Sequence, residues 1–388
     1  MRSGCIVRNI FTGDNMKNIL DILKKIYGAQ TGYGKWCVIA IAAVFGIIGG
    51  TAAMVLTVDP FYRYHEPFFY KKVYYELYYT APSLLRNEKY DLLMLGTSMT
   101  RNFFLSDINE TFDCDAIKFA ASGGTTQDLR KFFDVAKDAK KDSLKRVVIS
   151  LDIYSMNKPD PRYEEADFMY DKGLRQEYRY FFSRKTFSSM FYLIKRAMRP
   201  KRARIHQVDR NRMFSTDYDG KPYGLREVLK DTYNNRRIHH TQTPYNKPVY
   251  ENSLSNALLP MIDENPGIQF TIYLPPYHIY TYCMSEQFKE ADPLIRQKSE
   301  VMKELLKRKN VTLHDFQSDP DYVCTHEFFC DVQHFSNTAA RRVLADLVTG
   351  KNLVKTEQDV EEKERALRAL IQKMMPQYNE HMQNYRKK

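Results

Sequence analysis

The chain has 388 residues, of which 43% are hydrophobic and 13% are aromatic. This length accommodates one large domain with an insertion, or two domains, and the apolar content excludes wholesale disorder. The formal net charge is +12, and residues 155–250 supply most of the excess, with 21 Lys and Arg against 11 Asp and Glu. A basic surface of this kind can bind nucleic acid, anionic lipid or an anionic polymer.

Residues 36–58 make the first predicted element, a run of 23 positions without a charge. About 20 consecutive apolar residues span the hydrocarbon core as a helix, and no polar stripe marks this run as a buried core helix. The apolar part of a cleaved signal peptide is shorter, about 7–15 residues. Residues 1–35 hold six Lys and Arg against two Asp, and such an excess stays cytoplasmic. We therefore predict a single-pass signal anchor in the cell membrane, with the N-terminus cytoplasmic and everything after Asp59 extracytoplasmic. This topology makes nucleic acid the least favoured of the three partners.

Six cysteines are present, four of them after the anchor: Cys114, Cys283, Cys324 and Cys330. An even number of cysteines in an extracytoplasmic domain permits disulfides. A bridge between Cys324 and Cys330 would brace the loop that follows, but two free thiols fit the sequence equally well. No second close cysteine pair is present, so we predict no metal site.

Downstream of the anchor, short apolar runs alternate with helical segments. We expect strands at residues 90–95, 116–119, 146–153, 269–274 and 311–313, and helices after residue 125, at about 286–307 and from residue 337. This alternation predicts an α/β domain with a parallel sheet covered on both faces, over residues 59–350.

Two further segments flank or interrupt this pattern. Residues 155–250 are predicted to form a largely helical basic insertion, in which Met190, Phe191, Leu193 and Ile194 form one apolar helix face. That face would either rest on an anionic membrane surface or pack on the domain as a cap. The tail, residues 351–388, is predicted to form a charged amphipathic helix that frays after Pro376.

A candidate catalytic triad is distributed over distant parts of the chain. Ser98 follows the first strand, and Asp331 and His334 follow the last one and precede a helix. Open parallel sheets place their active sites at this carboxyl edge. His334 would take the proton of Ser98, and Asp331 would orient the imidazole and stabilise its charge. These are the three roles that serine-based acyl transfer requires.

At these residues the chain resembles the SGNH (GDSL-like) hydrolase superfamily. Gly96-Thr97-Ser98 matches its first sequence block, Ser122-Gly123-Gly124 its second, and Asp331-x-x-His334 its last. The resemblance extends over about residues 88–348, without the insertion. It implies a flavodoxin-like three-layer sandwich, no cofactor, and an oxyanion hole built from the amides of Ser98 and of Gly123 or Gly124.

The third block departs from this resemblance, because Asp152 stands where the superfamily has an asparagine that donates to the oxyanion. An ionised carboxylate only accepts hydrogen bonds and would repel the developing charge. Three explanations remain open: Asp152 is protonated, it organises its loop, or another donor such as Asn157 or Asn102 serves.

Asp152 is also a candidate for contacting the substrate, and so are three more residues. Arg101 could bind a carboxylate or be an ordinary helix-surface residue, and Tyr277 and His278 could line an acceptor site at the carboxyl end of the fourth strand. For His278 a structural role in its loop is the main alternative.

The anchor narrows the comparison to the membrane-anchored extracytoplasmic branch, which includes the D-alanyl transfer protein of teichoic acid biosynthesis and alginate-type O-acetylation proteins. That resemblance implies an acyltransferase or esterase acting on a cell-envelope polysaccharide or teichoic-acid-like polymer, beside a multi-pass membrane acyltransferase. The alternative is a non-catalytic extracytoplasmic scaffold that binds such a polymer or acyltransferase through the basic insertion.

Overall fold

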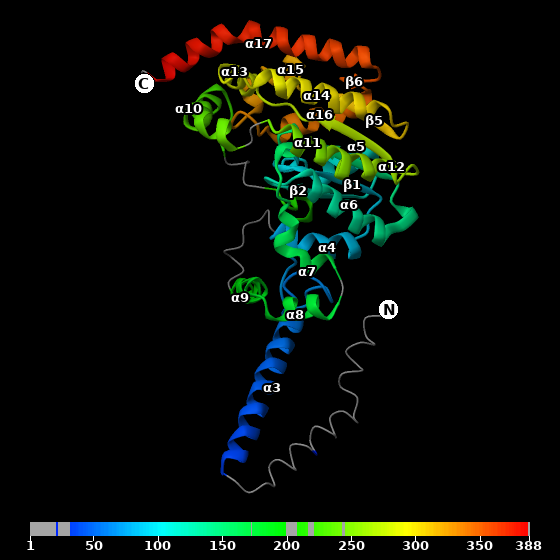
Figure 1. The fold of residues 1–388 in the computed structure, drawn as a ribbon, viewed down its shortest axis with the longest axis vertical. Coiled ribbons are helices and arrows are strands. Elements are labelled where there is room, and N and C mark those ends of the chain that lie inside the picture. Colours follow the sequence, from blue (N-terminus) through cyan, green and yellow to red (C-terminus); the bar gives the residue numbers. More distant parts are fainter. Residues whose placement is uncertain are drawn as a thin grey trace.

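The computed structural model describes residues 21, 32–171, 173–198, 208–215, 221–242 and 245–386. Figure 1 shows a long helix, α3 (Gly32–Val58), leading from one end into a small helical region and then into a larger body built on a sheet. The C-terminal helix α17 (Glu357–Arg386) lies across the far end of this body.

The body is built around one six-stranded sheet with the order β2-β1-β3-β4-β5-β6. The strands are β1 (Leu92–Thr97), β2 (Ala116–Ala121), β3 (Arg146–Ser150), β4 (Gln269–Leu274), β5 (Val311–Asp315) and β6 (Leu353–Val354). The first five pair in parallel, and β6 pairs antiparallel with β5. The predicted α/β class and the five parallel strands are confirmed. β6 was not predicted, because two residues are too few to show a period.

Helices cover the sheet. They are α4 (Leu77–Asn87), α5 (Leu105–Phe112), α6 (Thr126–Lys140), α12 (Leu259–Asp263), α13 (Ile279–Gln287), α14 (Ala291–Leu306), α15 (Pro320–Val323) and α16 (Asn337–Thr349). Both α4 and α5 contact β2, in which every residue is buried. Strands covered on both faces are nearly continuous apolar runs, which is why β1 and β2 contain no polar alternation, although Lys118 lies within β2.

The insertion is helical in its described parts, with α7 (Asp167–Tyr170), α8 (Leu174–Phe182), α9 (Arg184–Met198), α10 (Leu225–Gln242) and α11 (Lys247–Ser253). Helices α8 and α9 contact the end of α3. The predicted apolar face of α9 is divided: Met190 and Leu193 are buried, whereas Phe191 is 60% exposed. One side of α9 therefore packs as a cap while an aromatic side chain stays outside.

Helix α17 corrects the expectation of fraying after Pro376, because it continues to Arg386. Tyr378 and Met382, both beyond the proline, are buried against the body. The hydroxyl of Tyr280 on α13 also makes a 2.8 Å hydrogen bond with His381 Nδ1. Tertiary packing thus offsets the backbone hydrogen bond that a proline removes from a helix.

Helix α3 is long and apolar enough to cross a membrane by length and composition, over Tyr33–Val58 with a mean hydropathy of 2.4. Most of its side chains are exposed. Val38 is buried near the start of the helix, and Val55 and Val58 are buried where it meets the body. The predicted apolar segment is therefore one helix that projects from the folded domain.

A buried ion pair braces the end of β5. Lys298 Nζ on α14 lies 2.8 Å from Asp315 Oδ2, and both side chains are almost fully inaccessible. Burial raises the pKa of Asp315, but Lys298, together with the charge of Lys363 and the Gln317 amide, outweighs burial and holds that pKa below its ordinary value. Asp315 also accepts from the Gln317 amide and the Ser318 hydroxyl, each at 3.0 Å. The carboxylate thus holds the turn that leaves β5.

We expect Lys298→Met to destabilise the full chain by about 3–5 kcal/mol, because removing one partner leaves a buried charge uncompensated. Denaturant unfolding in detergent measures this change. The double variant Lys298→Met/Asp315→Leu removes both charges and should recover part of the loss, because the Gln317 amide and the Ser318 hydroxyl still lose their acceptor. A single-variant loss below about 1 kcal/mol would show that Asp315 is not held as a buried anion.

Candidate active site

Ser98 opens a short 3-10 turn, η1 (Ser98–Thr100), directly after β1. The turn packs tightly on Gly96: a Cβ at that position would meet the Thr100 side chain and lie 2.7 Å from Ser150 Cβ. Real Cβ atoms essentially never come so close, so only glycine fits there. The close approach lets the chain turn sharply and presents Ser98 at the carboxyl edge of the sheet.

The structure brings the three predicted catalytic residues together. Ser98 Oγ lies 2.8 Å from His334 Nε2, and His334 Nδ1 lies 2.7 Å from Asp331 Oδ2. The other carboxylate oxygen, Asp331 Oδ1, accepts the backbone amides of Gln333 at 2.8 Å and His334 at 2.6 Å. A nucleophile, a base and an orienting carboxylate are thus in hydrogen-bond contact, which is the geometry that serine activation needs.

The environment of Asp331 keeps it ionised. Burial raises the pKa of this carboxyl, but the neighbouring His334 and the two backbone amides outweigh burial and lower the pKa below its ordinary value. The His334 and Asp331 side chains keep exposures of 20% and 19%. A substrate can therefore reach the imidazole while the carboxylate stays a pure acceptor for Nδ1–H.

The loop that carries Asp331 and His334 is fixed by backbone contacts from α13. The backbone amide of His278 and the hydroxyl of Thr281 both donate to the Val332 carbonyl, at 3.0 and 2.6 Å. The described cysteines, including Cys324 and Cys330, are free thiols. Cys330 braces the loop without a bridge, since its backbone amide donates to the His334 carbonyl at 3.1 Å.

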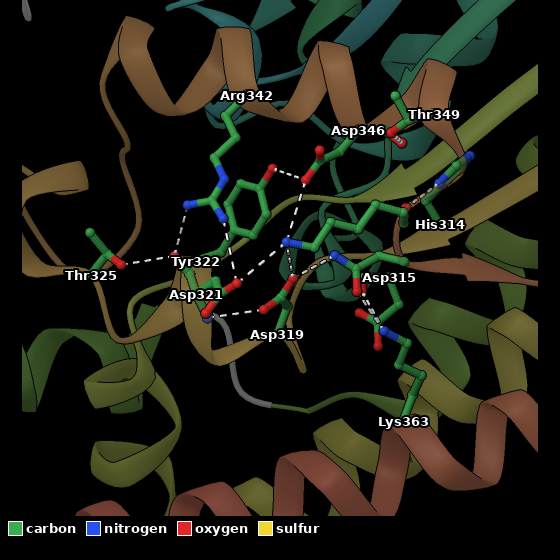
Figure 2. A network of polar contacts seen from close by, with 12 residues as sticks. His314, Asp315, Asp319, Asp321, Tyr322, Thr325, Arg342, Asp346, Thr349 and Lys363 are labelled. Carbon is green, nitrogen blue, oxygen red and sulfur yellow. Dashed lines mark hydrogen bonds and ion pairs between the residues drawn. The ribbon is translucent and has the colours of Figure 1, made fainter.

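A polar network lies between the helices that precede and follow this loop in the chain, α15 and α16. Figure 2 shows the Tyr322 ring beside Arg342, with its hydroxyl bonded to Asp346. That bond measures 2.6 Å, and the Arg342 guanidinium lies 4.7 Å from the ring centroid. Arg342 also pairs with Asp321 at 3.5 Å, and Asp321 accepts Thr325 Oγ1 through its carbonyl at 2.8 Å. These contacts join α15 to α16 on either side of the catalytic loop.

The two glycines predicted for the oxyanion hole differ in this structure. Gly124 donates its amide to the Ala121 carbonyl at 2.8 Å, whereas the Gly123 amide donates to no acceptor among the described residues. Gly123 also has a φ of +64°, a left-handed conformation that favours glycine. Thr97 pairs with Ala121 in the sheet, so the loop through Gly123 starts beside Ser98. Gly123 is the better placed donor of the two.

Asp152 organises its loop, one of the three explanations open from the sequence. Its carboxylate accepts the Thr97 hydroxyl and the Tyr154 amide, both at 3.1 Å, and the hydroxyl of Tyr277. Tyr277 is 1% exposed and therefore does not line an open acceptor site. The bond to Thr97 ties the third strand's loop to the residue just before Ser98.

The two asparagines considered as substitute donors use their amides elsewhere. Asn157 donates to the Ile153 carbonyl at 3.2 Å and to Gln297 Oε1 at 2.9 Å, so both of its amide hydrogens are engaged. Asn102 donates to the Phe335 carbonyl. The Asn157 amide is therefore not available to an oxyanion, which corrects the expectation for Asn157, whereas Asn102 uses one of its two amide hydrogens in the bond to Phe335.

His278 is structural as well. It is fully buried, its Nδ1 accepts the Tyr280 amide at 3.1 Å, and its Nε2 lies 2.8 Å from His326 Nδ1. Burial, with a smaller effect of His326, lowers the pKa of His278 well below its ordinary value. A neutral ring that caps α13 has no free nitrogen for a substrate, so the acceptor-site prediction for His278 fails.

Lys118 is an important residue that the sequence reading missed. It lies in the middle of β2 and is fully buried, and its Nζ donates to the Arg101 carbonyl at 3.0 Å and the Phe103 carbonyl at 2.6 Å. Both carbonyls belong to the chain just after Ser98. A lysine inside an apolar strand is itself a signal, because lysine is almost never buried without partners. Burial, helped by the charge of Arg101, lowers the pKa of Lys118 to about 7.

Arg101, predicted as a substrate contact, is three residues after Ser98 and donates its amide to the Ser98 carbonyl at 3.2 Å. Its side-chain Nε is buried with no hydrogen-bond partner among the described residues. The described residues hold no group of three or more His, Cys, Asp or Glu that could bind a metal.

Comparison with known proteins does not identify the family. A scan against protein-family models finds no match, and no curated protein matches the chain significantly. The chemical argument therefore depends on the geometry of the site.

We expect Asp331→Asn to slow the reaction of Ser98 with a fluorophosphonate probe by about 10⁴-fold, because an amide does not hold the imidazole in the tautomer that accepts the serine proton. Labelling rates on folded protein measure this effect. Asp171→Asn, which changes an exposed carboxylate far from the loop, is the matched control and should label normally. Wild-type labelling of Asp331→Asn would mean that the carboxylate does not orient the base.

Lys118 should make stability rise with pH. The folded protein releases this proton near pH 7, whereas an unfolded lysine keeps it to about pH 10. Between these values the unfolded chain binds more protons, so the free energy of unfolding increases by up to about 1.4 kcal/mol per pH unit. Denaturant midpoints across that range, compared with those of Lys118→Met, isolate the effect. Parallel curves for the two proteins would contradict it.

Proposed function

We propose that this chain is a membrane-anchored, SGNH-type serine acyltransferase or esterase that acts on a cell-envelope polysaccharide or a teichoic-acid-like polymer. The observation that carries the proposal is the contact of Ser98 with His334 and of His334 with Asp331, at 2.8 and 2.7 Å. The strand order β2-β1-β3-β4-β5 supports it, because flavodoxin-like doubly wound sheets have this order. The positions of the three sequence blocks along those strands support it further.

The geometry permits a two-step transfer through an acyl-serine. His334 Nε2 takes the Ser98 proton as Oγ attacks the donor carbonyl, and His334 then protonates the leaving group. In the second step His334 deprotonates the acceptor hydroxyl, which attacks the acyl carbonyl, and the released Ser98 recovers its proton. With water as the acceptor the same steps give an esterase.

The proposed oxyanion hole leads us to expect a slow enzyme. The amides of Ser98 and Gly123 would stabilise the developing charge, and the third position holds an acceptor, Asp152, in place of a donor. One missing donor costs about 10²–10³ in rate. A slow hydrolase that transfers its acyl group to a bound polymer fits this chemistry.

The proposed location is the outer side of the cell membrane, with α3 as a single-pass anchor and the N-terminus cytoplasmic. A multi-pass membrane acyltransferase would then supply the acyl group, as the resemblance to the anchored extracytoplasmic branch implies. The exposed Phe191 on α9 and the contact of α9 with α3 favour a membrane-facing role for this helix in addition to its capping role.

A non-catalytic scaffold is the second candidate, favoured by the commitment of Asp152, Asn157 and Asn102 to structural hydrogen bonds. It differs from the first in one measurable respect. A catalytic Ser98 reacts covalently with a fluorophosphonate, whereas a folded scaffold stays unlabelled.

We expect Ser98→Ala to abolish polymer acylation in cells and fluorophosphonate labelling in vitro, without changing membrane location or thermal stability. The reason is that the variant loses the nucleophile but no packing. Ser188→Ala, an exposed serine on α9, is the control and should label like the wild type. Full acylation in cells that produce only Ser98→Ala would refute the proposed function.

A further inference from the structure

Two basic side chains, Lys158 and Arg162, lie against the loop through Gly123, and a third, Arg101, belongs to the turn that follows Ser98 and acts on the charge of Tyr78 beside that loop. We call Arg101, Lys158 and Arg162 the basic rim. Lys158 Nζ donates to the Gly123 carbonyl at 3.3 Å, and Arg162 Nη1 donates to the Ser122 carbonyl at 2.8 Å. A Cβ built on Gly123 would lie 3.9 and 3.8 Å from these two nitrogens. Lys158 and Arg162 therefore lie next to Gly123, whose backbone amide donates to no acceptor among the described residues.

No carboxylate neutralises the basic rim. Among the described residues, none of its three members lies within 4.0 Å of a carboxylate oxygen, although cations elsewhere on the body, such as Arg130 and Arg308, form ion pairs. Lysine has three donors and arginine five. Each carbonyl bond of Lys158 and Arg162 uses one donor, so most of their hydrogen-bonding capacity remains for another acceptor.

Buried polar groups without partners line the same loop. Tyr78 is 7% exposed, and its hydroxyl has no hydrogen-bond partner among the described residues. This hydroxyl lies 2.9 Å from where a Cβ of Gly124 would be, and the Arg162 guanidinium lies 5.2 Å from the Tyr78 ring centroid. The Ser122 hydroxyl and Arg101 Nε are likewise buried and unpartnered. A buried donor without an acceptor costs about 1–3 kcal/mol, so these groups point to a ligand that accepts hydrogen bonds.

We infer that the basic rim binds an anionic group, a phosphate or a carboxylate, on the polymer that accepts the acyl group. This inference rests on the proposed function, because it takes Ser98 as the acyl carrier. Guanidinium and ammonium groups form their strongest hydrogen bonds with such oxyanions. An anion held here would place a neighbouring sugar or polyol hydroxyl near the acyl-serine, where His334 can deprotonate it.

The test compares binding of three fluorescent oligomers to the full chain in detergent: an oligophosphate, an oligogalacturonate and a neutral dextran. Fluorescence anisotropy is measured on the Ser98→Ala protein, which prevents turnover. We expect one or both anionic oligomers to bind and dextran to bind at least about tenfold more weakly. The oligophosphate and oligogalacturonate arms tell which anion the site prefers.

Substitution locates the site. In the same background, Lys158→Gln/Arg162→Gln should weaken binding of the preferred anion by about tenfold or more, since a hydrogen bond to a charged group contributes about 1.5–3 kcal/mol. Lys195→Gln/Arg196→Gln removes the same charge from α9 and should change affinity by less than about threefold. Equal losses in the two double variants, or no loss in the first, would overturn the inference. Thermal melting checks that each variant is folded.

A parallel labelling experiment separates this inference from the proposed function. If wild-type Ser98 reacts with a fluorophosphonate but Lys158→Gln/Arg162→Gln binds anions normally, the anion site is wrong and the enzyme remains. If Ser98 never reacts but the double variant loses anion binding, the binding site stands and the acyl-transfer chemistry fails.

Discussion

The hydrogen bond between Ser98 and His334 joins residues 236 positions apart, and the candidate site exists only because two loops are held in register. The parallel sheet brings both loops to its carboxyl edge, but that edge extends over several strands. Hydrogen bonds between the loops therefore set the distance between Ser98 and His334. Asn102, just after the nucleophile, donates to the Phe335 carbonyl, and Asn337 donates back to the Asn102 carbonyl at 2.8 Å. These two bonds fasten the chain just after Ser98 to the chain just after His334.

Asp152 also helps to hold the segments around Ser98 in place. A carboxylate at this position accepts from Thr97, Tyr154 and Tyr277, which belong to three different segments. An asparagine has one acceptor oxygen and could not satisfy all three donors together. The carboxylate of Asp152 therefore makes a rigid junction beside Ser98.

The five parallel strands and the three triad residues could be predicted from the sequence, because apolar runs and short motifs are local signals. The capping of α6 by Thr125 is local too and is present as a reciprocal capping box with Asp128. The roles of Asn157, Tyr277 and His278 could not be predicted, since each depends on partners far along the chain. Asn157, for example, bonds Gln297, 140 residues away. Lys118 was missed for a related reason: its carbonyl partners lie in a loop whose path no pattern reveals.

The junction between α3 and the body restricts how the site can move relative to a membrane. Asp59, the residue after α3, is fully buried and accepts the backbone amides of Arg63 at 3.0 Å, Tyr64 at 2.7 Å and His65 at 2.9 Å. The hydroxyl of Tyr180 on α8 donates to the same carboxylate. A buried carboxylate that accepts four hydrogen bonds fixes the orientation of α3 relative to the body, because rotating the helix would break these bonds and leave the carboxylate unsatisfied. If α3 spans a membrane as proposed, the body is held at a fixed angle to that membrane. The fold then also fixes the distance from the lipid surface to Ser98.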